Sequence, residues 1–228
     1  MISIYQDKIS NIITNAKKYH DKFYKVEEFS GPSLYFHRRT IEMINSLNFE
    51  LYLEFIYATL ASWGMHRMGR GGAKMQSFEV FKDSIMKIVE QIRQARKIDY
   101  RNVNDTDWSI LRNIFCNVKV MVSKTNIVGN SKVMAHLLPN IIPPIDREYT
   151  LKYLKGNKNI RNGIDVEWKL MREIIEKFFI PVAKNPNFIC KANDWIANQS
   201  DYPWDTSIFK VIDNLIIGAG LIAKEEKK

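Results

Sequence analysis

The chain has 228 residues, of which 46% are hydrophobic and 26% are charged, so it can bury a sizeable core and is not intrinsically disordered. No apolar run approaches the length of a membrane span, and the N-terminus lacks a secretion signal, so we expect a cytoplasmic protein without a membrane partner. The formal net charge of +9 favours a polyanionic partner such as DNA or RNA, although a lysine-rich composition alone would also produce it.

Helical periodicity recurs along the chain and few stretches alternate with period two, which predicts an all-α fold. The residues expected to cap helices are Asn48, Ser77, Thr206 and either Asn104 or Asp105. We expect helices over residues 3–20, 40–47, 49–65, 78–98, 105–122, 147–154, 166–183, 187–199 and 207–220. The helix at 166–183 should end near Pro181 and Pro186, because proline interrupts a helix. The helix at 207–220 should end at a glycine cap formed by Gly218 and Gly220.

The sequence contains no internal repeat and no long linker, which indicates one compact, multi-helix domain over residues 1–228. Two helical lobes, about 1–102 and 103–228, are the alternative organisation. Between them, at residues 125–150, lies the stretch with the densest chemical signals.

This central stretch predicts a helix-hairpin-helix-like element followed by an aspartate, Asp146. Gly129, Asn130 and Ser131 are expected to form a tight turn before a short helix, where backbone N–H groups and the helix N-terminus would hold a DNA phosphate. Pro143 and Pro144 should then stiffen the approach to Asp146. A rigid approach suits a catalytic side chain.

The stretch resembles the HhH-GPD (helix-hairpin-helix) superfamily of DNA glycosylases over about two dozen residues. The residues that match the hairpin, the apolar helix and the Pro-containing turn are Val128, Gly129, Lys132, Ala135, Pro143, Pro144 and Asp146. In bifunctional members of the superfamily a lysine two places after the second glycine forms a Schiff base. Here that place is Ser131, and Lys132 follows it.

The resemblance implies a base-excision mechanism with Asp146 and Lys132 as the catalytic residues. Such an enzyme flips a base into a pocket and stacks it on aromatic rings. Asp146 would then stabilise the oxocarbenium-like sugar or activate water, and Lys132 would attack the sugar carbon. A competing interpretation is that Asp146 only caps the helix at 147–154, because Asp is favoured immediately before a helix.

A glycine-rich basic loop follows the helix at 49–65 and is a second candidate for binding nucleic acid. Four of the ten glycines of the chain lie at 64–72, among several cations. Close backbone approach and positive charge both suit a phosphate backbone, whereas a plain interhelical loop would have the same composition. The residues predicted to bind are Arg67, Arg70, Gly71, Gly72 and Lys74.

A third candidate is the aromatic and basic cluster at 35–39. Aromatic rings between arginines can stack on bases and hold phosphates, so His37, Arg38 and Arg39 are predicted to contact nucleic acid. The alternative places Tyr35 and Phe36 in the core, with the arginines in solvent.

The four histidines are scattered, so the sequence predicts no metal site and no cofactor. Within its apolar helix, His136 is more simply a core histidine whose hydrogen bonds are satisfied. Cys116 and Cys190 are expected to be buried free thiols, since a reducing cytoplasm disfavours a disulfide.

Three functions remain open at this level. The first is a DNA-repair glycosylase, the second is a non-catalytic helical module that binds DNA or RNA, and the third is a helical protein-interaction module whose charge is compositional. The sequence does not indicate the oligomeric state.

Overall fold

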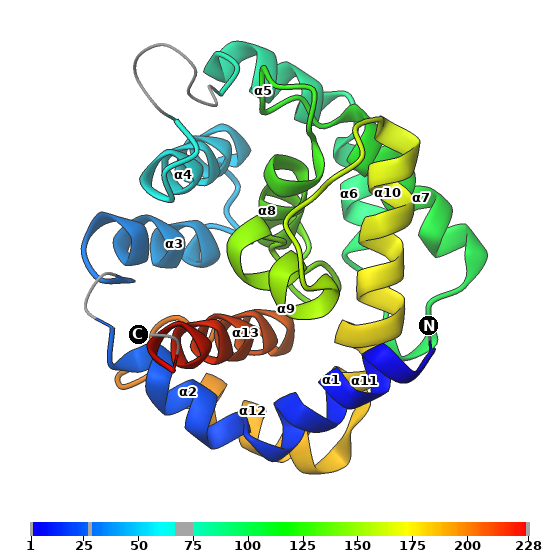
Figure 1. Ribbon diagram of the computed structural model, residues 1–228. Coiled ribbons are helices and arrows are strands. Elements are labelled where there is room, and N and C mark those ends of the chain that lie inside the picture. The colour runs from blue at the N-terminus through cyan, green and yellow to red at the C-terminus, as the bar shows by residue number, and fades with distance from the viewer. Residues whose placement is uncertain (1, 27–28, 67–74, 227–228) are drawn as a thin grey trace.

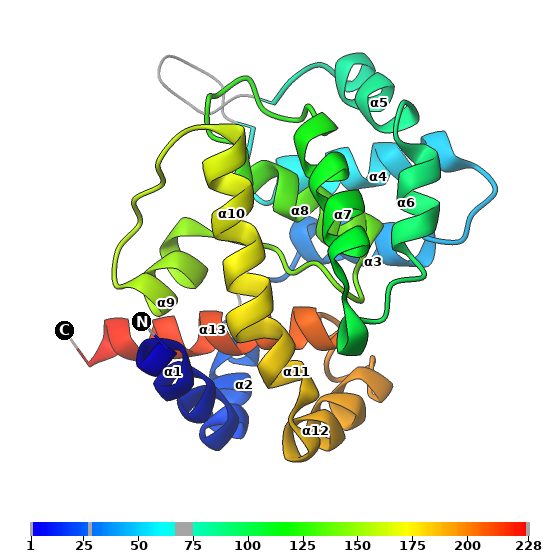
Figure 2. The same cartoon turned by 90° about the vertical axis from the view of Figure 1, so that its right-hand side faces the viewer.

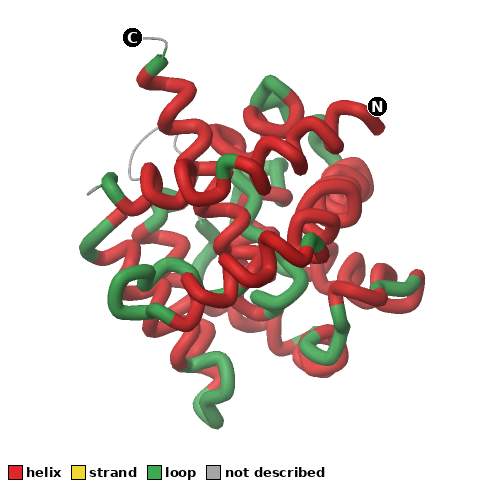
Figure 3. The backbone as a smooth tube through the Cα atoms, turned by 90° about the horizontal axis from the view of Figure 1, so that it is seen from below, coloured by secondary structure: helices red, strands yellow, loops and turns green. Residues whose placement is uncertain are grey.

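The computed structural model describes residues 2–26, 29–66 and 75–226, and within these ranges the chain is helical with no strand. Figure 3 shows the helices joined by loops of varied length. The first half contains α1 (Ile2–Thr14), α2 (Ala16–Tyr24), α3 (Pro32–Glu42), α4 (Phe49–Ser62), α5 (Phe78–Met86), α6 (Val89–Ala95), the 3₁₀ turn η2 (Tyr100–Asn102) and α7 (Asp105–Asn117). The second half contains α8 (Ile127–Leu137), η3 (Arg147–Leu151), α9 (Lys152–Lys155), α10 (Ile164–Ile174), η4 (Ile175–Phe179), α11 (Ile180–Lys184), α12 (Pro186–Ala197) and α13 (Ile208–Glu225). The predicted all-α class is confirmed.

The helix starts agree with the capping residues of the sequence. The Asn48 side chain accepts a hydrogen bond from the backbone N–H of Leu51 at 3.0 Å, and the Ser77 side chain caps α5. Asn104 and Asp107 form a reciprocal capping box at the start of α7. Ser207, and not Thr206, caps α13.

Several helix boundaries differ from the prediction. The helix expected at 40–47 is α3, which begins at Pro32, because proline suits the first turn of a helix. The expected helices at 3–20 and 78–98 are each divided in two, and the one at 105–122 ends at Asn117. The helix at 166–183 passes through Pro181, because the π-helical segment η4 precedes it and places the proline in the first turn of α11.

The largest error concerns the C-terminal helix, for which Gly218 and Gly220 are not caps. Helix α13 continues to Glu225 and packs along α2 near the N-terminus of the chain. A Cβ atom at Gly218 would lie 2.0 Å from the backbone oxygen of Tyr19, so glycine is needed where these two helices cross. Figure 2 shows α13 beside α1 and α2.

One continuous hydrophobic core includes buried residues from both sides of residue 102, so the ranges 1–102 and 103–228 do not have separate cores. Helix α8 lies in the middle of the molecule and the other helices surround it (Figure 1). Nine of its eleven residues are buried, including the polar residues Asn130, Ser131, Lys132 and His136. A central helix with buried polar side chains must satisfy them internally.

Candidate functional site

Lys132 and Asp146, which are 14 residues apart in the chain, meet in the structure. Lys132 extends from α8, and Asp146 immediately precedes η3. The Lys132 Nζ atom lies 3.3 Å from Asp146 Oδ2. The Asp146 side chain is 32% exposed and the Lys132 side chain 11%, so the pair lies at the border between core and solvent.

The two carboxylate oxygens of Asp146 have different partners. Oδ1 accepts a hydrogen bond from the backbone N–H of Glu148 at 2.7 Å, and the Asp146 N–H donates to Thr150 Oγ1 at 3.1 Å. The capping role considered for Asp146 is therefore present, because Oδ1 satisfies a free N–H of the first turn. Oδ2 is directed to Lys132 and is not used by the cap.

The pair borders a pocket of about 420 Å³ with aromatic walls. The pocket is lined by Phe23, Phe29, Ser33, Ser62, Trp63, Gly64, Lys132, Pro144, Asp146, Tyr149, Trp204, Lys210, Asp213 and Ile217. Lys132 Nζ lies 5.6 Å from the centroid of the Trp63 ring, within cation–π range. The indole N–H of Trp63 is buried without a hydrogen-bond partner, and no other buried side-chain nitrogen or oxygen of the described residues lacks one. Flat rings and paired charges together suit a planar, polar ligand.

A second lysine–aspartate pair, which the sequence analysis missed, borders the same pocket. Lys210 Nζ donates to Asp213 Oδ2 at 2.8 Å and also to Asn214 Oδ1. The network continues inward, since Asn214 Nδ2 donates to Asp205 Oδ1 and the other oxygen of Asp205 lies 2.7 Å from His20 Nε2. The signal was visible in the sequence, because charged and amide residues at positions i, i+3 and i+4 are unusual in so apolar a helix.

The surroundings of Asp213 change its acidity. Burial raises the pKa of its carboxyl above the ordinary value, and the negative charge of Asp146 raises it further. The ammonium groups of Lys210 and Lys132 oppose this shift but do not cancel it. Asp213 therefore holds its proton more tightly than a carboxyl in water does, although Lys210 Nζ remains within hydrogen-bond distance of it.

His37 is buried behind the pocket, which contradicts its predicted contact with nucleic acid. His136 Nδ1 lies 2.8 Å from the backbone oxygen of Lys132 and must donate to it, so His136 Nε2 is left to accept from His37 Nδ1 at 3.1 Å. His37 Nε2 then accepts from the Thr206 hydroxyl. Burial lowers the pKa of His136 to about 4 and that of His37 well below its ordinary value, so both rings are neutral. His136 is the satisfied core histidine that the sequence suggested.

The predicted phosphate-binding turn is also different. Gly129, Asn130 and Ser131 lie within α8 and are buried. Asn130 Nδ2 donates to two backbone oxygens of the core and Ser131 Oγ accepts from the Ile145 N–H, so both side chains are used inside the protein. The N-terminus of α8 is already occupied by the buried carboxylate of Glu167, which accepts hydrogen bonds from the backbone N–H groups of Asn126 and Ile127. A hydrogen-bonded protein carboxylate takes the place that a phosphate would need there.

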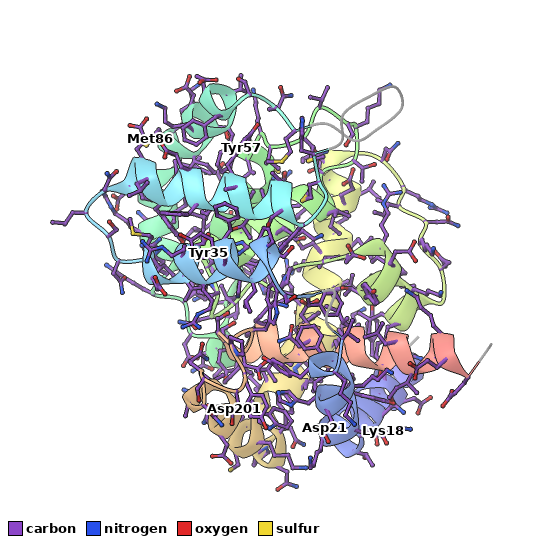
Figure 4. All side chains as sticks on the ribbon, turned by 90° about the vertical axis from the view of Figure 1, so that its left-hand side faces the viewer. Lys18, Asp21, Tyr35, Tyr57, Met86 and Asp201 are labelled. Carbon is purple, nitrogen blue, oxygen red and sulfur yellow. The ribbon has the colours of Figure 1, made fainter. Side chains whose placement is uncertain are left out.

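Of the other basic candidates, the two that the structure describes, Arg38 and Arg39, do not line the pocket. Arg39 forms an ion pair with Glu42 at 2.6 Å and lies over the ring of Phe55, while Arg38 is exposed. Figure 4 labels Tyr35 on the outer side of the same helix, α3, where it is exposed and not in the core. The residues predicted at Arg67, Arg70, Gly71, Gly72 and Lys74 lie outside the described part of the chain.

Both cysteines are free, although Cys190 is exposed and only Cys116 is partly buried. Within residues 2–26, 29–66 and 75–226, no group of three His, Cys, Asp or Glu side chains has the arrangement of a metal site. None of the described helices has both the length and the apolar character that crossing a membrane would require.

Comparison of the chain with protein-family models, with curated proteins and with solved structures gives no match.

Proposed function

We propose that the pocket is the active site of a nucleic-acid-binding protein that cleaves the N-glycosidic bond of a DNA base. The observation that carries the proposal is the meeting of Lys132 with Asp146 at 3.3 Å beside an aromatic pocket. An aromatic pocket of this size suits a single base removed from its stack.

The geometry gives each group a role in this reaction. A base entering the pocket would stack against Trp63 or Trp204. The free oxygen of Asp146 would stabilise positive charge on the sugar as the bond to the base weakens. Lys132, after giving a proton to Asp146, would attack the sugar carbon as the bond to the base breaks, and the departing base would take that proton from Asp146, which restores the carboxylate.

The decisive experiment measures base release from duplexes that contain uracil, hypoxanthine, 8-oxoguanine or 3-methyladenine. The key variant is Asp146→Asn, because Asn keeps the cap to Glu148 but loses the charge. We expect single-turnover base release to fall about 10²- to 10⁴-fold in this variant. Borohydride should trap a covalent complex with the wild-type protein and none with Lys132→Gln.

Asp165→Asn is the matched control, because Asp165 is exposed and pairs with Arg112 at the surface. This control should release base at the wild-type rate. Equal rates for Asp146→Asn and the wild type, or no release from any of the four duplexes, would overturn the proposal. If no duplex releases its base but the protein still binds the strand, the pocket belongs to a non-catalytic DNA- or RNA-binding module, in which Asp146 acts only as a helix cap.

A further inference from the structure

A second pocket, of about 320 Å³, adjoins the first at Tyr149. Both pockets include Tyr149 in their walls. The second is formed by segments far apart in the chain, namely α1, α2, the η3–α9 segment and the end of α13. A Cβ at Gly220 would lie 3.0 Å from the Tyr149 ring, so the glycine leaves room for this ring between the pockets.

Unpaired lysines surround the second pocket. Four lysines line it: Lys8, Lys18, Lys152 and Lys224. None of them forms an ion pair with any residue that the structure describes. The lining also contains two glutamates, Glu226 and Glu148, of which Glu148 is paired with Lys158, so the four lysines leave an excess of positive charge. Excess positive charge in a concave site attracts anions.

Tyrosine rings lie between these lysines. Lys8 Nζ is 4.8 Å from the ring centroid of Tyr153, and Lys224 Nζ is 4.9 Å from that of Tyr149. The Tyr153 hydroxyl donates to the backbone oxygen of Lys8, which ties α9 to α1. Alternating cations and aromatic rings allow phosphates to be neutralised while bases stack, which is the chemistry of single-stranded nucleic-acid binding.

We propose that the second pocket binds the strand of nucleic acid next to the nucleotide held in the first pocket. The inference rests on the proposed function and deepens it, since it makes the substrate a polymer and not a free nucleoside. Tyr149 would separate the reacting nucleotide from its neighbour. The lysines would hold the neighbouring phosphates without reading the base sequence.

An anionic membrane is the other polyanion that the lysines would attract, but the surface does not favour it. Insertion into a lipid surface needs exposed apolar side chains beside the charges. The large hydrophobic residues that are exposed among those described are Tyr35, Leu47, Val80, Met86, Val122 and Val166, and none of them lines this pocket. Nucleic acid therefore fits the observations better.

The test is the salt dependence of binding to a fluorescein-labelled oligothymidylate, measured by anisotropy from roughly 50 to 200 mM salt. The variant is Lys18→Gln/Lys152→Gln, in which both lysines are exposed and line the pocket (Figure 4 labels Lys18). The control is Lys87→Gln/Lys97→Gln, which removes the same charge from exposed lysines at the ends of α5 and α6. Removing two phosphate contacts should reduce the slope of log K against log salt by about 1.4.

The result that supports the inference is a reduced slope in the Lys18/Lys152 variant only. Equal slopes for variant and control would overturn it, as would variant-specific loss of binding to phosphatidylserine vesicles without loss of oligonucleotide binding. Base release assays on the same proteins separate the two proposals. If the Lys18/Lys152 variant releases base at the wild-type rate at every salt concentration, the inference alone is overturned. If the proteins bind the strand with the expected slopes but release no base, the proposed activity alone is overturned.

Discussion

Glu167 provides the sharpest test of how the site is held, because its buried carboxylate supports the helix that carries Lys132. Oε2 accepts hydrogen bonds from the backbone N–H groups of Asn126 and Ile127, at 2.6 and 2.7 Å. Oε1 accepts from the Gly163 N–H at 3.2 Å. One side chain of α10 thus satisfies the N-terminus of both α8 and its own helix.

The substitution Glu167→Gln keeps the shape and removes one acceptor and the charge. The new carbonyl oxygen can keep the bonds to Asn126 and Ile127, but the amide nitrogen then faces the Gly163 N–H, donor against donor. A buried donor without a partner costs about 1–3 kcal/mol. The lost charge at a buried helix N-terminus adds up to about 2 kcal/mol. We therefore expect Glu167→Gln to lower the free energy of unfolding by about 2–4 kcal/mol.

Urea denaturation followed by tryptophan fluorescence measures this difference as a lower midpoint at an unchanged slope. The control is Glu54→Gln, at an exposed position of α4 without an ion pair among the described residues, where the change should stay within about 0.5 kcal/mol. If the two variants lost the same stability, the support of α8 by Glu167 would be refuted.

Two further variants test the packing and the buried histidines. Gly218→Ala places a Cβ 2.0 Å from a backbone oxygen of α2 and should lower the free energy of unfolding by about 1–3 kcal/mol. Gly220→Ala meets only a side chain, at 3.0 Å, and should lower it by less. Equal urea midpoints of the two variants would contradict this. His136 has a folded-state pKa of about 4, below its ordinary 6.5, so the unfolded chain binds the extra proton and stability falls as the pH is lowered between these values. Between pH 7 and pH 5, the protonation of this histidine in the unfolded chain should lower the free energy of unfolding by about 2 kcal/mol. The loss should shrink in His136→Gln and persist in the exposed-site control His66→Gln, and an identical pH dependence of all three proteins would refute the argument.

The sequence by itself determined the helical class and many helix starts. Period-3.6 hydrophobicity and side chains such as Asn48 and Asn104 act within a few residues of the chain, so they can be read locally. It also selected Lys132 and Asp146, and the structure places these two side chains beside each other. Local signals were less informative where a helix continues against its own propensity, as at Pro181 and Gly218.

Only the tertiary structure decided which polar residues face the pocket and which are buried behind it. His37 and Arg38 are neighbours in the sequence, yet one is enclosed between Thr206 and His136 and the other is exposed. Lys210 lines the pocket because it lies on α13, and α13 is held there by its close crossing with α2 at Gly218. This crossing joins segments near the two ends of the chain. Burial and charge pairing of this kind depend on elements distant in sequence, and no local pattern specifies them.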